Sequence, residues 1–214
     1  MADTGFFNDT HWHAEAGLSF DALACMRGLS LVFENISAKI DSGQALALYG
    51  ANGSGKTSLL RLVAGLLPPH AGCILPAPQP QQSHYLAHMD GLKNLLTVAE
   101  MLAHFGASFA AGAYDGDEVL TQLGLAGRAG QKIGDLSAGQ RRRLTFARLL
   151  IAPRRLWLLD EPMTALDEQG RDFLNRLAAA HLAVGGLIIA ASHEKLAFAT
   201  DTLTLDSQAQ KGAA

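Results

Sequence analysis

The sequence carries a glycine-rich octapeptide whose residue types and spacing suit the capture of phosphate. Residues 50–57 read GANGSGKT, which satisfies the pattern G-x-x-x-x-G-K-[ST]. Glycines let the loop turn tightly with its N–H groups pointing inward, and a helix that begins near Lys56 adds the positive end of its dipole. Lys56 would hold the β- and γ-phosphates, and the hydroxyl of Thr57 would offer an oxygen to Mg²⁺. Loops of this kind also serve kinases, GTPases and motor proteins. The predicted phosphate-binding residues are Gly50, Ala51, Asn52, Gly53, Ser54, Gly55, Lys56 and Thr57.

Two adjacent carboxylates follow a short apolar run later in the chain. Residues 156–162 read LWLLDEP, so a predicted buried strand ends in Asp160 and Glu161 before a proline. Because side chains alternate along a strand, one acid could complete the Mg²⁺ shell while its neighbour polarises a water for attack on the γ-phosphate. A kinase would instead need an acid aimed at a substrate hydroxyl. Beside the phosphate loop, the pair favours nucleotide hydrolysis over a solvated strand end.

A third candidate element is the helix start at residues 136–140, which read LSAGQ. Ser137 with Gln140 three residues later forms the pattern of a capping box. A helix N-terminus flanked by Ser137 and Gly139 is also suited to bind a phosphate, and the two roles are compatible. In the company of the loop and the acid pair, we favour a second phosphate-binding surface.

These residues need a scaffold in which strands and helices alternate. The glycine-bounded apolar residues 44–49 predict a strand buried on both faces, and residues 58–67 predict a helix that ends at a Pro-Pro pair. A helical stretch from Thr97 to about residue 128 is interpreted as an insertion, whereas residues 72–82 are rich in Pro and Gln. Alternation of this kind implies a parallel sheet with helices on both faces. Further strands are predicted over 18–24, 29–33, 36–40, 156–159, 187–190 and 202–205, and further helices over 138–151 and 168–183.

Composition and charge exclude several classes of protein. The chain has 214 residues, of which 49% are hydrophobic and 17% charged, enough to bury the core of one domain or of one domain with an insertion. A formal net charge of −3 provides no global positive field, so we expect no nucleic-acid partner. The two cysteines, Cys25 and Cys73, form no C-x-x-C motif, which indicates reduced thiols of the cytosol. The longest apolar runs fall short of the roughly 20 residues that span a bilayer.

The two chain ends are predicted to be polar tails on a single domain. Residues 1–17 carry Asp3, Asp9 and Glu15, and they lack the basic start and apolar core of a secretory signal. Residues 207–214 form the second predicted tail. The predicted domain is residues 18–206.

The order of the motifs resembles that of ABC-type ATPase subunits. The phosphate loop, the LSAGQ pentapeptide, the acid pair, an ALD tripeptide at 165–167 and an SH pair at 192–193 follow one another as in that family. The pentapeptide is similar to the family signature LSGGQ, with Ala138 for one glycine. The resemblance covers about residues 42–194. It implies an α/β fold of the P-loop NTPase type, with a mostly parallel sheet, an N-terminal antiparallel β subdomain and a helical subdomain inserted at about residues 90–145.

The same resemblance implies a head-to-tail homodimer around two ATP molecules. In such pairs each ATP lies between the phosphate loop of one chain and the signature of the other. Ser137, Gly139 and Gln140 would therefore meet the nucleotide held by the partner chain. Asp167 would lie across the same seam.

Within one chain, the resemblance assigns roles in hydrolysis. Glu161 would be the general base that activates water, and Asp160 would be the acid of the Mg²⁺ shell, beside Thr57. His193 would clasp the γ-phosphate. The cofactors implied are ATP and Mg²⁺.

Two positions depart from the general family pattern. The glutamine that normally touches magnesium and water is replaced by His88, which can still donate or accept a hydrogen bond. The place of the aromatic residue that stacks on adenine holds Arg27, with Phe33 the nearest aromatic. Either side chain could stack on a base.

A narrower resemblance is to the CcmA family, the ATP-binding subunits of the heme exporter used in cytochrome c maturation. It is carried by HYLAHMDGLK at 84–93, by LWLLDEP at 156–162 and by the short length after His193. That family similarly tends to have a histidine at the glutamine position. The resemblance implies integral membrane partner subunits and a peripheral location on the cytoplasmic face of the bacterial inner membrane. We expect no direct heme binding by this chain, because the His11-Trp12-His13 run lacks a partner at helical spacing.

Other functions stay open at this point. One is a soluble ABC ATPase for iron–sulfur assembly or repair, which should purify with soluble partners. Another is a nucleotide-binding regulatory module without hydrolysis. A small-molecule kinase ranks last, since it would transfer phosphate to an acceptor.

Overall fold

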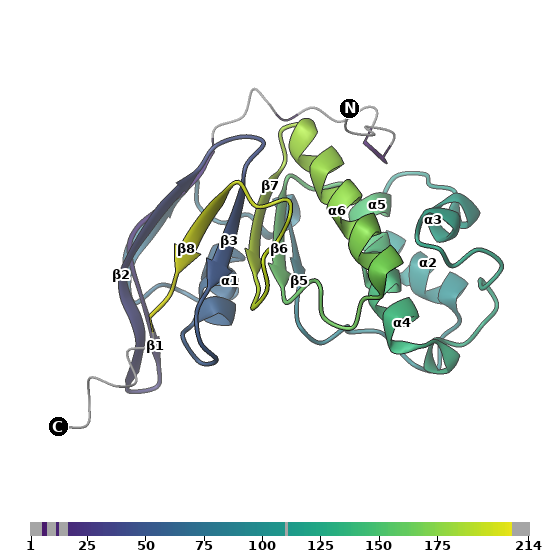
Figure 1. Cartoon of the computed structure of the whole chain (residues 1–214), viewed down its shortest axis with the longest axis horizontal. Helices are drawn as coiled ribbons and strands as arrows, with labels where there is room; N and C mark the ends of the chain where they lie inside the picture. Colours follow the sequence, from purple (N-terminus) through teal and green to yellow (C-terminus); the bar gives the residue numbers. More distant parts are fainter. Residues whose placement is uncertain (1–5, 8–11, 13–16, 110, 207–214) are drawn as a thin grey trace.

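The computed structural model describes residues 6–7, 12, 17–109 and 111–206, and the chain folds as a sheet-rich lobe beside a helical lobe (Figure 1). The strands are β1 (Leu18–Arg27), β2 (Ser30–Ile40), β3 (Ala45–Tyr49), β4 (Ala71–Leu75), β5 (Ser83–Leu86), β6 (Leu156–Asp160), β7 (Leu187–Ala191) and β8 (Asp201–Thr204). The helices are α1 (Lys56–Val63), α2 (Val98–Ser108), α3 (Gly116–Gln122), α4 (Ala138–Thr145), α5 (Ala147–Ile151) and α6 (Glu168–Ala183), with short 3-10 turns at Pro80–Gln82 and Ile133–Asp135.

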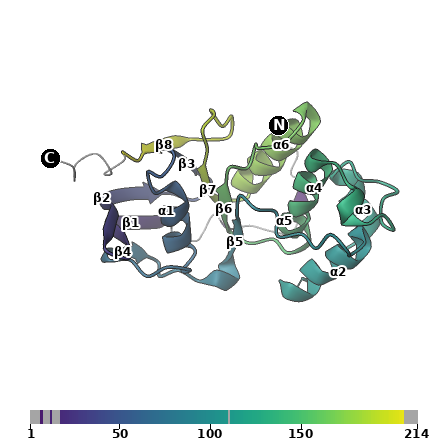
Figure 2. The ribbon, with the colours of Figure 1, turned by 90° about the horizontal axis from the view of Figure 1, so that it is seen from below.

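A five-stranded parallel sheet forms the centre of the molecule, in the order β5-β6-β7-β3-β8. Alternate residues of β3 point to opposite faces: Ala45 and Ala47 join the core with α6, whereas Leu46 and Leu48 join the core with α1. Figure 2 shows α1 and α6 on the two sides of the sheet. This two-sided burial explains why the central strands read as continuous apolar runs.

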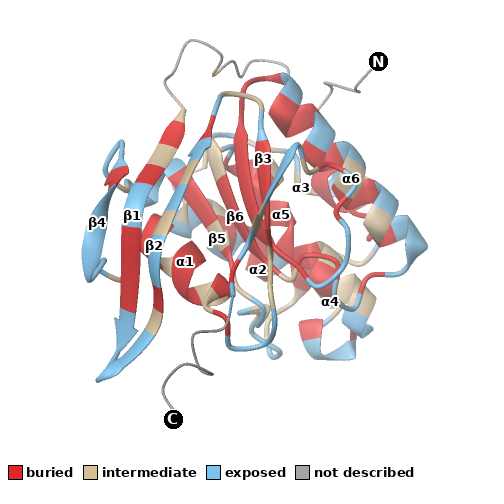
Figure 3. Cartoon of the chain, turned by 60° about the vertical axis from the view of Figure 1, so that its left-hand side comes forward, coloured by how far each residue is buried: buried red, intermediate tan, exposed pale blue. Residues whose placement is uncertain are grey.

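A second sheet, antiparallel with the order β2-β1-β4, packs on the far side of α1. Its inner residues are buried and its outer ones exposed (Figure 3). The two strands predicted over 29–33 and 36–40 are one strand, β2. Asn35 has a positive φ of 54°, but the strand continues on both sides of it. β4 and β5 were not predicted; β4 lies largely within the Pro- and Gln-rich segment and β5 directly follows it, and the two gain their order by pairing with β1 and β6.

The helical insertion consists of separate short helices. The predicted stretch 97–128 divides into α2 and α3, since Tyr114 packs against Gly106 and Asp115 caps a new helix through Asp117 N and Glu118 N. The prediction of one helix over 138–151 is also corrected: α4 and α5 are separated at Phe146, whose N–H donates to Arg143 O. The helix predicted over 58–67 runs from Lys56 to Val63.

Part of the segment predicted as an N-terminal tail packs against the domain. Phe7 is buried, and the backbone N–H of Trp12 donates to Val184 O at 2.8 Å. Both rings meet His181 edge-on, with centroids 5.8 and 5.3 Å away, and His181 is stacked on Trp157 at 3.8 Å. These aromatic residues therefore extend the core, while His11, His13 and residues 207–214 lie outside the described residues. The predicted fold class, a P-loop α/β protein with an antiparallel sheet and a helical insertion, is confirmed.

Candidate functional site: a nucleotide cleft

The phosphate loop connects the end of β3 to the start of α1. Gly55 has a φ of 104°, and a Cβ at this position would collide with the ring of Phe33. Only glycine fits this close approach without strain. Lys56 is 7% exposed, and its Nζ donates to Gly50 O at 2.7 Å and to Ala51 O at 3.3 Å. The ammonium group thus orders its own loop, and it has a third N–H for an anion.

The acid pair stands beside this loop, at the end of the neighbouring strand β6. Asp160 is 4% exposed, and its Oδ2 accepts a hydrogen bond of 2.8 Å from Thr57 Oγ1. Glu161 has a φ of 51°, a left-handed conformation that is uncommon outside glycine, and its N–H donates to Ala191 O at 2.9 Å. Its Oε1 lies 3.3 Å from Nε2 of His193, which follows β7. Two acids and a histidine therefore converge from the ends of adjacent strands.

These groups border a cleft of about 650 Å³. Most of the residues predicted for the nucleotide site reach it, including His88 from the loop after β5 and Arg27 from the end of β1. Thr164, just beyond the acids, also lines the cleft but was not predicted. The lining residues are Arg27, Val32, Asn52, Gly53, Ser54, Gly55, Lys56, Thr57, Ser58, His88, Asp160, Glu161, Thr164 and His193.

Phe33 does not reach the cleft. Its side chain is 1% exposed and packs in the core beneath Gly55. The prediction that it could stack on adenine is therefore not supported, because neither face of its ring is open to a base. Of the two candidates, Arg27 lines the cleft.

The signature residues lie away from this cleft, at the start of α4. Ser137 and Gln140 form the predicted capping box: Ser137 Oγ accepts from Gln140 N at 3.2 Å, and Gln140 Oε1 accepts from Ser137 N at 3.0 Å. Ser137 is exposed, and Gly139 is partly exposed. Asp167 caps α6 by accepting from Gly170 N at 2.9 Å, and its carboxylate lies 4.0 Å from Arg143. None of the four residues lines the cleft of its own chain.

Comparison with known proteins identifies the family to which the chain belongs. The model of the ABC transporter family matches residues 33–164. The cytochrome c biogenesis ATP-binding export protein CcmA of Rhodopseudomonas palustris (strain BisB5) is 46% identical over 198 residues, covering 90% of this chain and 99% of that protein. CcmA of Bradyrhizobium diazoefficiens is 50% identical over 186 residues, covering 84% and 92%. The chain belongs to the CcmA family of ABC transporter ATP-binding proteins.

The resemblance stated from the motifs is thus confirmed, and the chain is an ABC ATPase that binds nucleotide. A solved ATP-binding subunit of an ABC transporter has the same fold, with a TM-score of 0.78 at 20% identity over 90% of this chain and 88% of that one. Among the residues that the structure describes, this ABC ATPase has no helix with the length and apolarity to cross a bilayer.

Proposed function

We propose that the chain is the ATP-hydrolysing subunit of the heme exporter of cytochrome c maturation. The observation that carries this proposal is the identity of 46–50% to CcmA proteins over most of the chain. In this proposal residues 18–206 act as one ATPase domain. The chain sits on the cytoplasmic face of the inner membrane and passes its motion to integral membrane subunits.

The cleft fits ATP with Mg²⁺. Thr57 and Asp160 place two hard oxygen groups 2.8 Å apart beside the loop, and oxygen ligands of this kind suit Mg²⁺, whose other ligands are phosphates and water. When bound, the ion would neutralise charge that develops on the β- and γ-phosphates. Lys56 adds a fixed positive charge on the same side, and Arg27 stacks on the adenine ring.

Hydrolysis in this site is assigned to Glu161. Its carboxylate accepts a proton from a water whose oxygen forms a bond to the γ-phosphorus, and the bond between that phosphorus and the bridging oxygen breaks. ADP and phosphate are the products. His193, 3.3 Å from the carboxylate, orients it and contacts the γ-phosphate, and His88 binds the same water from the opposite loop.

A second copy of the chain completes the cleft. Ser137, Gly139, Gln140 and Asp167 lie outside the cleft of their own chain, which supports their action on the nucleotide of a head-to-tail partner. The exposed start of α4 offers backbone N–H groups and the positive end of a helix dipole to a phosphate. ATP then favours the closed pair, and hydrolysis removes the phosphate that both chains share.

The test is genetic and biochemical. In a bacterium that carries this gene, deletion should abolish heme-stained c-type cytochromes, and the wild-type gene should restore them. Lys56→Met should not restore them, whereas Glu194→Gln, an exposed acid paired with Arg171 outside the cleft, should. Affinity purification from solubilised membranes should recover small hydrophobic subunits. Normal c-type cytochromes in the deletion strain, or recovery only with soluble iron–sulfur proteins, would contradict the proposal.

A further inference from the structure

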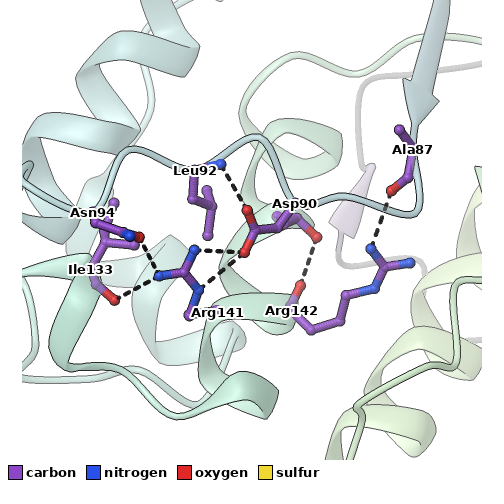
Figure 4. Close-up of polar contacts among 8 residues, drawn as sticks. Ala87, Asp90, Leu92, Asn94, Ile133, Arg141 and Arg142 are labelled. Atoms are coloured by element: carbon purple, nitrogen blue, oxygen red, sulfur yellow. Dashed lines mark hydrogen bonds and ion pairs between the residues drawn. The ribbon is translucent and has the colours of Figure 1, made fainter.

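Arg142 is a buried arginine of α4 whose guanidinium serves main-chain carbonyls. The residue is 6% exposed, and its guanidinium carbon lies 5.9 Å from the ring centre of Phe146. Its Nη2 donates to Glu161 O at 2.8 Å and to Asp160 O at 3.3 Å, and its Nη1 donates to Ala87 O at 3.4 Å. One side chain therefore joins α4, the end of β6 and the loop after β5; Figure 4 shows its bond to Ala87.

Two of the three carbonyls belong to residues that line the nucleotide cleft, and the third belongs to the neighbour of a lining residue. Asp160 and Glu161 are the acid pair, and Ala87 immediately precedes His88. Glu161 keeps a left-handed backbone, which in a residue other than glycine persists only where the surroundings hold it. Ala191 binds the N–H of Glu161, and Arg142 binds its carbonyl, so the two bonds fix this residue from both sides.

The positive charge of Arg142 also suits a residue that holds the acid pair in place. Burial lowers its pKa, whereas the carboxylates of Asp90, Asp160 and Glu161 act in the opposite direction. An arginine stays protonated even so. The guanidinium thus sets a fixed positive charge behind the acid pair, with its Nη groups bonded to carbonyls rather than to the carboxylates.

The preceding residue, Arg141, ties α4 to the loop after His88. Its Nε and Nη2 donate to Asp90 Oδ2 at 3.0 and 2.8 Å, and its Nη1 donates to Asn94 Oδ1 and, at 3.4 Å, to Ile133 O. Figure 4 shows the two guanidinium groups reaching this loop at different points. α4 is therefore attached both to the loop that carries His88 and to the acid pair.

We propose that Arg142 is a positioning residue, which sets the placement of Glu161 and His88 from the helix whose N-terminus carries the signature. The inference rests on the role of general base proposed for Glu161. α4 begins at the exposed Ser137 cap, and Arg142 lies little more than one turn further along the helix. If α4 moves when its N-terminus binds a phosphate, Arg142 would transmit that movement directly to the main-chain carbonyl of Glu161. No group in the cleft would need to relay it.

The test compares three variants of the full chain in ATP turnover and ATP binding. Arg142→Met removes the donors but keeps much of the volume, and we expect kcat to fall 10- to 100-fold while KM for ATP changes less than threefold. Arg142→Lys keeps the charge and can reproduce one or two of the hydrogen bonds to the carbonyls, so its kcat should lie between those of wild type and Arg142→Met. Arg176→Met, on the exposed side of α6, serves as the matched control and should keep the wild-type kcat.

The outcomes separate positioning from folding and from the role of Glu161. A parallel loss of kcat, ATP affinity and melting temperature in Arg142→Lys as well as Arg142→Met would overturn the proposal, because it would show a merely structural role. Wild-type kcat in Arg142→Met would overturn it too. If Glu161→Gln alone keeps its turnover, the base assignment fails, and the effect of Arg142 on kcat can no longer be attributed to Glu161. If Glu161→Gln is inactive while Arg142→Met is normal, only the positioning role fails.

Discussion

At the scale of single residues, the part of the cleft proposed to be catalytic depends on bonds to the backbone as much as on side chains. Glu161 is held by its own N–H and carbonyl in a left-handed conformation, and its carboxylate is then free to face His193 at 3.3 Å. Lys56 is similarly ordered by two carbonyls of its own loop. Preorganised groups of this kind need little rearrangement when a nucleotide arrives.

Replacement of the proposed base tests this arrangement. Glu161→Gln should lower ATP turnover by roughly a hundred- to ten-thousand-fold, because an amide cannot accept the proton of the attacking water. ATP binding should persist, since the phosphate loop is unchanged. Phosphate release and nucleotide binding measured on the same preparation check both points. Glu194→Gln is the matched control, and turnover of Glu161→Gln at the level of that control would remove Glu161 from the role.

The sequence predicted the residues of the cleft whose motifs are local. The loop at 50–57 and the acid pair occupy contiguous segments, so spacing alone located them. Arg142 and Thr164 were missed because their importance depends on what lies across the fold: the carbonyls bound by Arg142 come from segments 18 to 55 residues away. Phe33 was misjudged because neighbouring sequence does not reveal that Gly55 lies over its ring.

At the scale of elements, buried strands and helices were predictable from apolar periodicity, and short elements were not. β5 has four residues, and pairing with β6 rather than its own composition makes it a strand. The insertion showed helical character throughout, yet the position where α2 ends depends on the contact between Tyr114 and Gly106. Tertiary contacts of this kind override local propensity.

The packing of His181 between aromatic rings makes a neighbouring glycine indispensable. A Cβ at Gly186 would overlap the imidazole ring of His181, which is stacked on Trp157 and has no room to move. Gly186→Ala should therefore destabilise the fold by about 1–3 kcal/mol. Urea unfolding checks this, with Gly130→Ala as the control because a Cβ there meets nothing within 4 Å. Equal stability of the two variants would contradict the account.

The buried histidines predict that the fold weakens in mild acid. Burial lowers the pKa values of His84 and His181 to about 3, whereas in the unfolded chain they titrate near 6.5. Between these values the unfolded state binds more protons, so stability falls as the pH drops below 6.5 and recovers as it rises. Each histidine contributes up to about 1.4 kcal/mol per pH unit in this window.

Removal of one histidine measures this contribution. His181→Phe keeps an aromatic ring on Trp157 but cannot titrate, so the slope of the unfolding free energy between pH 6 and 5 should be lower by about 1.2 kcal/mol per pH unit. A wild-type slope in His181→Phe would show that the buried imidazole is not the group responsible.

At the scale of the whole molecule, the cleft and the proposed second phosphate-binding surface at the start of α4 lie apart in one chain. The phosphate loop, the acid pair and His193 surround the cleft, whereas the capped start of α4 is exposed elsewhere. A single chain therefore presents one incomplete cleft and one unused helix terminus. The proposed head-to-tail pair would bring the two together twice, which would account for both features at once.

The most direct measurement of this central claim is the mass of Glu161→Gln in solution by analytical ultracentrifugation. With ATP and Mg²⁺ the 22.6 kDa chain should pair, and with ADP it should remain single. Adding Ser137→Arg should abolish the pair by blocking the helix terminus. Thr97→Arg, which destroys the equivalent capping box of α2, should leave the pair intact. An ATP-bound chain that stays single, or a pair indifferent to Ser137→Arg, would contradict the account.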